Sequence, residues 1–184
     1  MKRVAIMIAD SCEEVEALTV VDMLRRAKMN IDMVSISNCL EVTGSHQITF
    51  QANRKIAEMD VEAYDAVILP GGMPGTIHLK EKKKVLQMVA DFYQKKKLVA
   101  AICAAPTVLA AAGILADKKA TCYPGMEEGL VNAQVIYDQE VVRDGNIITS
   151  QGLGTAIPFS LAIISYLSGE ESAKAVGEAI VYKK

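Results

Sequence analysis

The sequence has 184 residues, 51% of them hydrophobic, and a formal net charge of −2 at pH 7. This length predicts a single domain over residues 1–184 that needs no disulfide or metal to be stable. The charge argues against a nucleic-acid partner. No apolar stretch reaches membrane-spanning length, and the first apolar run ends at Asp10, too early for a signal peptide. We therefore expect a cytoplasmic protein with reduced thiols and no membrane partner.

Short apolar runs alternate with amphipathic segments along the chain, which is typical of a parallel sheet with helices on both faces. We predict a short hairpin over residues 40–50 with its turn at 44–45. Further strands are predicted at residues 4–9, 31–36, 65–69, 98–102, 120–123, 134–137 and 146–149. Helices are predicted at residues 13–28, 79–97, 104–114, 154–167 and 172–182. The predicted fold class is therefore α/β.

Ligands of parallel sheets bind beyond the carboxyl ends of the strands. The residues that follow the predicted strands are therefore the first place to look for a functional site. They form the segments 10–16, 70–75, 103–105, 123–124 and 150–154.

Cys103 directly follows the predicted strand 98–102, and small residues lie two positions away on either side, Ala101 and Ala105. This is the pattern of a nucleophile elbow, in which a sharp turn from strand to helix exposes the central side chain. The first amides and the dipole of the following helix would stabilise a thiolate and lower its pKa. The Ala104 amide could serve as an oxyanion donor. The alternative is a buried cysteine that acts as a small hydrophobic residue.

Two other segments after strands could complete such a site. Gly71 and Gly72 allow a turn whose amides point inward to hold an oxyanion, although a simple tight turn is the alternative. Glu13, Glu14 and Glu16 follow the first strand at a helix start, where carboxylates compensate the helix dipole. A carboxyl that faces the pocket would have a raised pKa and could bond a thiolate or move a proton. Periodicity does not decide which glutamate this is.

Four motifs together resemble a known family. They are E-E-V-E at residues 13–16, L-P-G-G at 69–72, A-A-I-C-A-A-P at 100–106 and T-S-Q-G-L-G-T at 149–155. In this order and spacing they resemble the DJ-one/ThiJ/PfpI superfamily, and within it the short bacterial ThiJ-like branch.

The resemblance implies a flavodoxin-like three-layer sandwich with a mostly parallel sheet, usually as a homodimer. It assigns Cys103 as the nucleophile and Glu16 as the carboxyl that hydrogen-bonds it. It places the amides of Gly72 and Ala104 in the anion-binding role, with no cofactor and no metal. The remaining pocket-lining residues are expected to be Gly71, Met73, Tyr123, Leu153 and His46.

Relatives in this superfamily have been assigned glyoxalase activity without glutathione, removal of early glycation adducts, oxidative-stress sensing and chaperone activity. The prediction is a cysteine-dependent enzyme, a glyoxalase-type lyase or deglycase-type hydrolase. Its partner would be a methylglyoxal-like carbonyl or a glycation adduct. The alternative is an oxidative-stress sensor or redox-regulated chaperone that works through oxidation of Cys103.

The sequence departs from the pattern of its relatives at three positions. Tyr123 replaces a histidine that the peptidase-like branch uses as a base, so a peptidase is disfavoured. His46 replaces an arginine; it could reach a partner subunit's pocket or lie on the hairpin surface. Leu153 replaces a proline and changes the pocket shape. Separately, Cys12 is either a resolving thiol for oxidised Cys103 or a packed core residue.

Overall fold

A seven-stranded sheet forms the centre of the computed structural model, which describes residues 2–183. Its strand order is β10-β11-β7-β6-β1-β2-β5. Neighbouring strands are parallel except for the β10–β11 pair, so the predicted mostly parallel sheet is confirmed. In chain order the strands are β1 (Arg3–Ile8), β2 (Asn30–Ser35), β5 (Arg54–Lys55), β6 (Ala66–Leu69), β7 (Leu98–Ile102), β10 (Val141–Asp144) and β11 (Ile147–Ser150).

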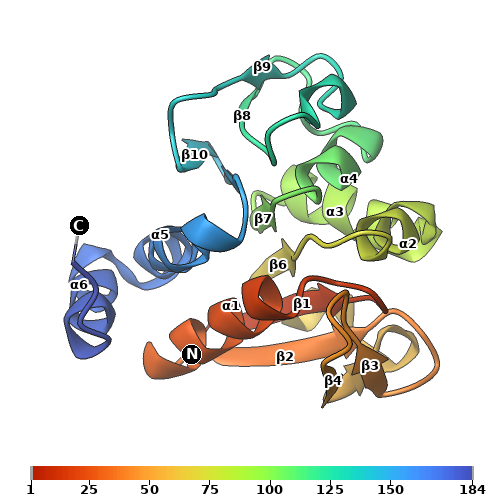
Figure 1. Cartoon of the computed structure of the whole chain (residues 1–184), viewed down its shortest axis with the longest axis horizontal. Helices are drawn as coiled ribbons and strands as arrows, with labels where there is room; N and C mark the ends of the chain where they lie inside the picture. The colour runs from red at the N-terminus through yellow and green to blue at the C-terminus, as the bar shows by residue number, and fades with distance from the viewer. Residues whose placement is uncertain (1, 184) are drawn as a thin grey trace.

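Helices cover both faces of this sheet and make three layers (Figure 1). One face carries α1 (Glu14–Arg26) and α5 (Ala156–Ser168), with α6 (Glu170–Ala179) packed on α5. The other face carries α2 (Gly75–Glu81), α3 (Lys83–Gln94) and α4 (Pro106–Ala111). Side chains of β1 alternate between the two cores, which explains why this strand is apolar throughout. Within residues 2–183 no helix has the length and apolar character needed to cross a membrane.

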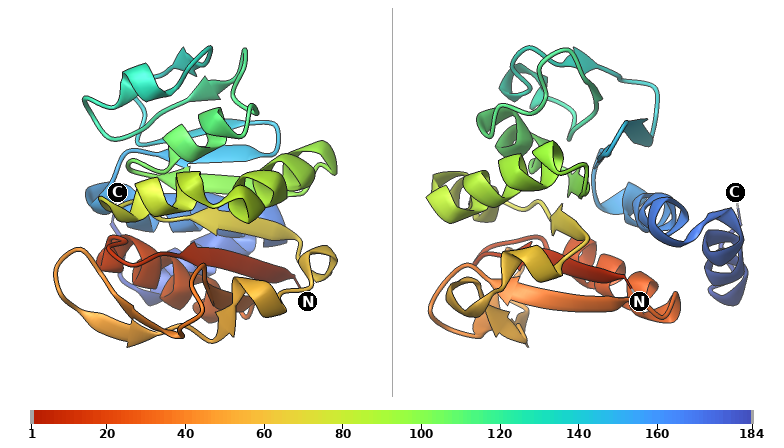
Figure 2. Two further views of the ribbon diagram at one scale, coloured as in Figure 1. Left: turned by 90° about the vertical axis from the view of Figure 1, so that its right-hand side faces the viewer. Right: turned by 180° about the vertical axis from the view of Figure 1, so that it is seen from behind.

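Two small sheets lie outside the central one. The hairpin β3 (Glu41–Thr43) and β4 (Thr49–Gln51) confirms the prediction for residues 40–50. β8 (Lys119–Ala120) and β9 (Gln134–Val135) form a separate parallel pair. Figure 2 shows the two small sheets at opposite ends of the molecule. Short 3-10 helices occur at η1 (Ile56–Glu58), η2 (Val61–Ala63), η3 (Glu127–Gly129) and η4 (Leu153–Thr155).

Several element predictions are corrected by the structure. The helix predicted over 79–97 is two helices, because Lys82 between them takes an extended conformation (φ −80°, ψ 98°). The strands predicted at 120–123 and 134–137 shorten to β8 and β9 and leave the main sheet. The edge strands β5 and β10 were not predicted. The helix predicted from residue 104 begins at Pro106, because the two preceding residues belong to the turn.

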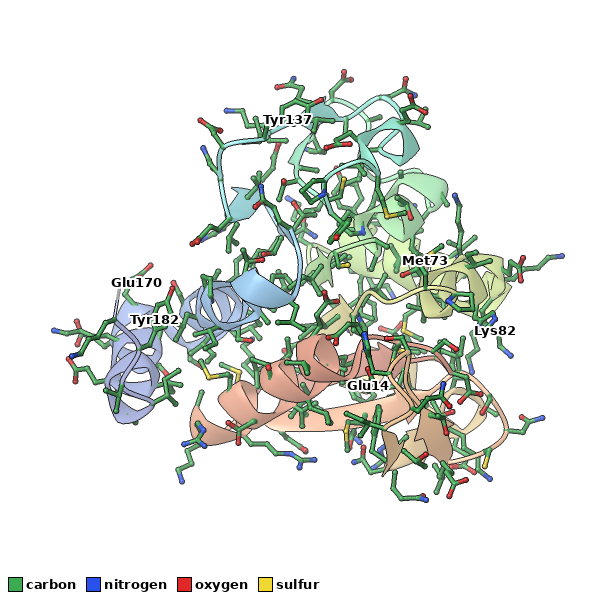
Figure 3. All side chains as sticks on the ribbon, in the orientation of Figure 1. Glu14, Met73, Lys82, Tyr137, Glu170 and Tyr182 are labelled. Atoms are coloured by element: carbon green, nitrogen blue, oxygen red, sulfur yellow. The ribbon has the colours of Figure 1, made fainter. Side chains whose placement is uncertain are left out.

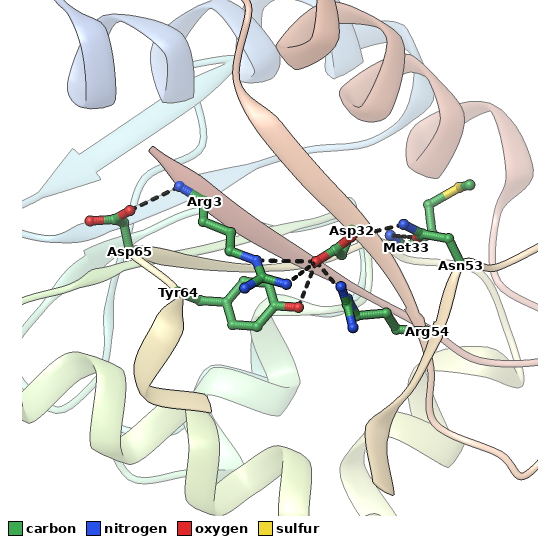
Figure 4. Close-up of polar contacts among 7 residues, drawn as sticks. All are labelled: Arg3, Asp32, Met33, Asn53, Arg54, Tyr64 and Asp65. Carbon is green, nitrogen blue, oxygen red and sulfur yellow. Dashed lines mark hydrogen bonds and ion pairs between the residues drawn. The ribbon is translucent and has the colours of Figure 1, made fainter. Parts of the chain in front are cut away.

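A charged cluster ties strand β2 to the neighbouring edge strand β5 and to β1 (Figure 4). Asp32 Oδ2 accepts hydrogen bonds from the Tyr64 hydroxyl at 2.6 Å and from Arg54 Nε at 2.9 Å. The Arg3 Nη2 group adds a third bond at 3.1 Å, and Asn53 Nδ2 donates to Oδ1 at 2.8 Å. Burial alone would raise the pKa of Asp32, but these donors lower it. The cluster stabilises this edge of the sheet. Its residues are distant in sequence from the cysteine elbow.

Candidate active site

Cys103 occupies a strained turn between β7 and α4. Its φ of 64° lies in the left-handed region, which non-glycine residues adopt rarely and mostly at functional sites. The turn is held from both sides: the Cys103 amide donates to the Ser150 carbonyl at 3.0 Å, and the Tyr123 amide donates to the Cys103 carbonyl at 2.8 Å. Since all of β7 is buried, the reversal brings the thiol to a half-buried position at the carboxyl end of the sheet. The structure therefore shows the predicted strand-to-helix turn at Cys103, while its role as a nucleophile stays a prediction.

Gly71 lies directly against the thiol. A Cβ at this position would come within 2.5 Å of Cys103 Cβ and 2.9 Å of Cys103 Sγ. It would also come within 2.8 Å of Glu16 Oε2. Only glycine therefore allows the loop after β6, the cysteine elbow and the helix α1 to approach one another this closely.

Glu16 is the glutamate that faces the cysteine, as the resemblance implied. It is 1% exposed and accepts a hydrogen bond from the Gly71 amide at 2.9 Å. Its Oε2 and the Cys103 sulfur both lie against Gly71, and the thiol lowers the pKa of the Glu16 carboxyl. Burial raises the pKa of the Glu16 carboxyl to about 7, and Gly71 and Cys103 offset only part of this effect. The carboxyl can therefore hold or release a proton near neutral pH.

The thiol pKa differs from the sequence-based expectation of a lowered value. Burial and the negative charge of Glu16 together raise the pKa of Cys103 to about 12, and the Gly72 and Ala104 amides only partly oppose them. The amides at the helix start are present, but burial of the thiol and the nearby Glu16 carboxylate have a larger effect on the thiol pKa than these amides do. The thiolate is favoured only when Glu16 carries the proton, so thiol and carboxyl behave as a pair sharing one proton.

The two predicted anion-binding amides act on the thiol electrostatically. The amides of Gly72 and Ala104 each lower the pKa of Cys103, against the larger effect of burial. Gly72 has a φ of 90°, and a Cβ there would lie 2.2 Å from the Glu13 amide nitrogen, so the position requires glycine. The Gly71 carbonyl accepts from the same Glu13 amide at 2.9 Å, which fixes the loop against the start of α1.

Glu13 and Glu14 have structural roles beyond the compensation of the helix dipole that the sequence predicts. Glu13 caps α1, because its Oε2 accepts from the Glu16 amide at 2.6 Å. Glu14 is buried and accepts from the amides of His46 at 2.7 Å and Ile48 at 3.3 Å, which anchors the β3–β4 hairpin. Gly44 allows this approach, since a Cβ there would overlap the Glu14 side chain at 2.1 Å.

His46 lies on the hairpin, with a side chain that is 71% exposed and Nδ1 3.2 Å from Glu14 Oε2. Within residues 2–183, the ligand atoms of Glu13, Glu14 and His46 form the one group close enough to hold a metal ion. Glu14 already accepts two backbone amides, so we assign no metal there. The structure places His46 against Glu14. None of the hydrogen bonds of His46 within residues 2–183 involves Cys103.

The other predicted pocket residues surround the elbow more loosely. Tyr123 is half exposed, and its amide donates to the Cys103 carbonyl. Leu153 is exposed on η4. Met73 lines a cavity formed with α2 and α4. Gly152 was missed as an individual residue: a Cβ there would lie 3.4 Å from the Tyr123 ring and 3.9 Å from Glu16 Oε1. Its only signal was its place after a predicted strand.

The remaining cysteines are not arranged as partners of Cys103. Cys12 is fully buried, and burial raises its pKa to about 12, which fits a packed core residue better than a resolving thiol. Cys122 is also buried, and burial raises its pKa to about 11. Cys39 is exposed. Of the four, only Cys103 combines partial access with a buried carboxyl beside it.

Comparison with known proteins shows which family the chain belongs to. The model of the DJ-1/PfpI family matches residues 2–166. The chain belongs to the DJ-1/PfpI family. Protein DJ-1 homolog A of Arabidopsis thaliana is 37% identical over 178 residues, 96% of this chain and 45% of that protein. Protein dj-1beta of Drosophila melanogaster is 35% identical over 181 residues, 98% of this chain and 97% of that protein.

This DJ-1/PfpI chain spans less than half the length of the Arabidopsis homologs A and B. Solved structures of the family superpose over its whole length. Drosophila DJ-1beta has a TM-score of 0.96 at 34% identity and covers 100% of this chain and 99% of its own. Oxidized Toxoplasma gondii DJ-1 has a TM-score of 0.95 at 31% identity and covers both chains completely. The flavodoxin-like fold is thereby confirmed, whereas the bacterial branch stays a prediction.

Proposed function

We propose that this protein is a cysteine-dependent enzyme that acts on small reactive carbonyls, either as a glutathione-independent glyoxalase or as a deglycase. One observation carries the proposal: a half-buried thiol on a strained elbow lies beside a carboxyl whose pKa is raised to about 7. A nucleophile paired with an acid/base that titrates near neutrality is what addition to a carbonyl and proton transfer require.

The reaction begins with proton transfer from Cys103 to Glu16. The thiolate attacks the aldehyde carbon of a 2-oxoaldehyde, a C–S bond forms, and the oxygen takes a proton from Glu16 to give a hemithioacetal. The Gly72 and Ala104 amides stabilise the negative charge on that oxygen.

Glu16 then removes the proton from the aldehyde carbon and delivers one to the neighbouring carbonyl carbon. The first carbon is oxidised to a thioester and the second is reduced to an alcohol, so no external oxidant or reductant is needed. Water cleaves the thioester, releasing a 2-hydroxy acid and the free thiol. With a glycation adduct, the released group is the amine. Peptidase activity is disfavoured because Tyr123 offers no imidazole base beside the thiol.

The deciding experiment measures lactate formation from methylglyoxal without glutathione. Wild type is compared with Cys103→Ser, Glu16→Gln and the matched control Cys122→Ser, which alters a buried cysteine outside the site. The proposal expects turnover by wild type and by the control, none by Cys103→Ser, and a loss of about 100-fold or more in Glu16→Gln. Absence of wild-type turnover, or full activity of Glu16→Gln, would reject it.

A second candidate function is an oxidative-stress sensor or redox-regulated chaperone, in which Cys103 is oxidised to a sulfinic acid. It is favoured by the partial access of this thiol, and the related Toxoplasma gondii protein was solved in an oxidized form. Gly72, Ala104 and protonated Glu16 are the donors available to sulfinate oxygens. Mass spectrometry after mild peroxide treatment tests it: unmodified Cys103 would exclude the sensor.

The proposal also includes a cytoplasmic homodimer. Its support is three exposed apolar side chains around the start of α1, at Val15, Ile48 and Leu153. The Ile48 amide bonds Glu14, which places the hairpin beside Val15. Sedimentation of wild type and Val15→Arg would test this: a dimer that the arginine converts to a monomer supports it, and a monomeric wild type rejects it.

A further inference from the structure

A cavity of about 270 Å³ lies between α2, α4 and the segment 125–129. Both helices pack on the face of the sheet opposite α1, so the cavity is separate from the Cys103–Glu16 pair. Figure 3 shows Met73 beside α2 and Glu14 beside α1, on different parts of the molecule. We call this cavity the α2 groove. It is lined by Met73, Thr76, Ile77, Lys80, Thr107, Gly125, Met126 and Gly129.

Large apolar side chains form the walls of the α2 groove without being buried. Met73, two residues before α2, is 48% exposed, and Ile77, within α2, is 41% exposed. Both side chains line the groove. Met126 faces them from the opposite segment. Exposed apolar side chains gathered around a hollow are typical of a ligand site, and methionine adapts readily to an incoming group.

Two polar residues of the groove, Thr76 and Lys80, are spaced four residues apart on α2. Thr76 is 2% exposed, and its hydroxyl is the one buried side-chain polar atom within residues 2–183 that has no hydrogen-bond partner. An unpaired buried hydroxyl is costly and is rare in folded proteins. Lys80 lies one helical turn further on and is the only charged residue that lines the groove. The groove therefore offers a cation and apolar walls, with an unpartnered hydroxyl buried beside them.

We propose that the α2 groove binds a small monocarboxylate with a short apolar body. The carboxylate pairs with Lys80 and accepts a hydrogen bond from Thr76 once the neighbouring side chains have shifted to expose its hydroxyl. The apolar body packs on Ile77 and Met126. The Thr76 amide donates to the Gly72 carbonyl at 2.8 Å, so a ligand here would adjoin the loop that contacts Cys103 from its other side.

The test is a titration of the full chain with hexanoate and, separately, with 1-hexanol, which has the same apolar body and no charge. Amide shifts in 1H–15N NMR spectra report the site. We expect hexanoate to shift Thr76, Lys80 and Met126, and hexanol to bind about fivefold more weakly. Lys80→Gln should reduce hexanoate affinity to that of hexanol. The matched control Lys83→Gln, which removes a lysine outside the groove, should leave it unchanged.

Two further variants keep the result decisive. Thr76→Val removes only the hydroxyl and should weaken hexanoate severalfold without loss of folding; unchanged affinity would remove Thr76 from the site. Cys103→Ser should bind hexanoate as wild type does, whether or not the protein is a carbonyl enzyme. Absence of shifts, shifts confined to Gly71, Gly72 and Ala104, or equal effects of Lys80→Gln and Lys83→Gln would overturn the proposal.

Discussion

Replacing Glu16 by glutamine should make the protein more stable at alkaline pH. Burial raises the pKa of this carboxyl from 4.5 to about 7, so folding favours its protonated form. The corresponding stabilisation is fully present below pH 4.5 and is lost as the pH rises through about 7. The whole shift corresponds to about 3 kcal/mol, of which about 2.5 kcal/mol is lost between pH 5 and 8.

Glutamine reproduces the protonated carboxyl, because its oxygen can accept from the Gly71 amide and its amide group can donate to the Cys103 sulfur. Urea unfolding of wild type and Glu16→Gln should therefore give similar free energies at pH 5. At pH 8 the variant should be more stable by about 2 kcal/mol. This gain would accompany the loss of turnover that the proposed reaction predicts, so stability and activity would change in opposite directions.

The matched control is Glu128→Gln, which changes an exposed glutamate in the same way. Its free energy of unfolding should follow that of wild type from pH 5 to 8. Other groups that titrate in this range are common to all three proteins and cancel in the differences. Parallel curves for wild type and Glu16→Gln would show that the carboxyl is not protonated near neutrality, and the proton-sharing pair would have to be abandoned.

Three further changes test the geometry around the site and at the sheet edge. Gly71→Ala should destabilise the protein by about 1–3 kcal/mol in urea unfolding, because the new Cβ overlaps the thiol, whereas Gly154→Ala, with open space around it, should cost little; equal effects would contradict the close approach. Glu14→Ala should cost about 2–3 kcal/mol and increase amide hydrogen exchange in the β3–β4 hairpin, whose amides lose their acceptor; unchanged exchange would refute that anchor. Asp32→Asn should cost about 3 kcal/mol, since it leaves two arginines around a neutral side chain, whereas Asp22→Asn breaks only a surface pair and should cost under about 1 kcal/mol; a mild Asp32→Asn would show that the cluster is not cooperative.

The regular parts of the fold were predictable because their signals are local. The apolar runs at β1, β6 and β7 are buried on both faces, and burial on both faces is what a continuous run predicts. The break at Lys82 was not predictable, because neither glycine nor proline interrupts the sequence there. The edge strand β5 has two residues and depends on pairing with β2, so nothing in its own sequence identifies it.

The residues around Cys103 predicted the elbow, since small residues on both sides of a cysteine after a buried strand are typical of this turn, but they left a buried core cysteine as the alternative. The sequence by itself did not determine which glutamate meets the thiol, because three of them share one helix start. Only the tertiary structure decided that Glu16 turns inward, Glu13 caps α1 and Glu14 anchors a hairpin more than thirty residues away. It also decided the charge of the site: a pKa depends on burial and on neighbours from other segments, and only packing brings those together.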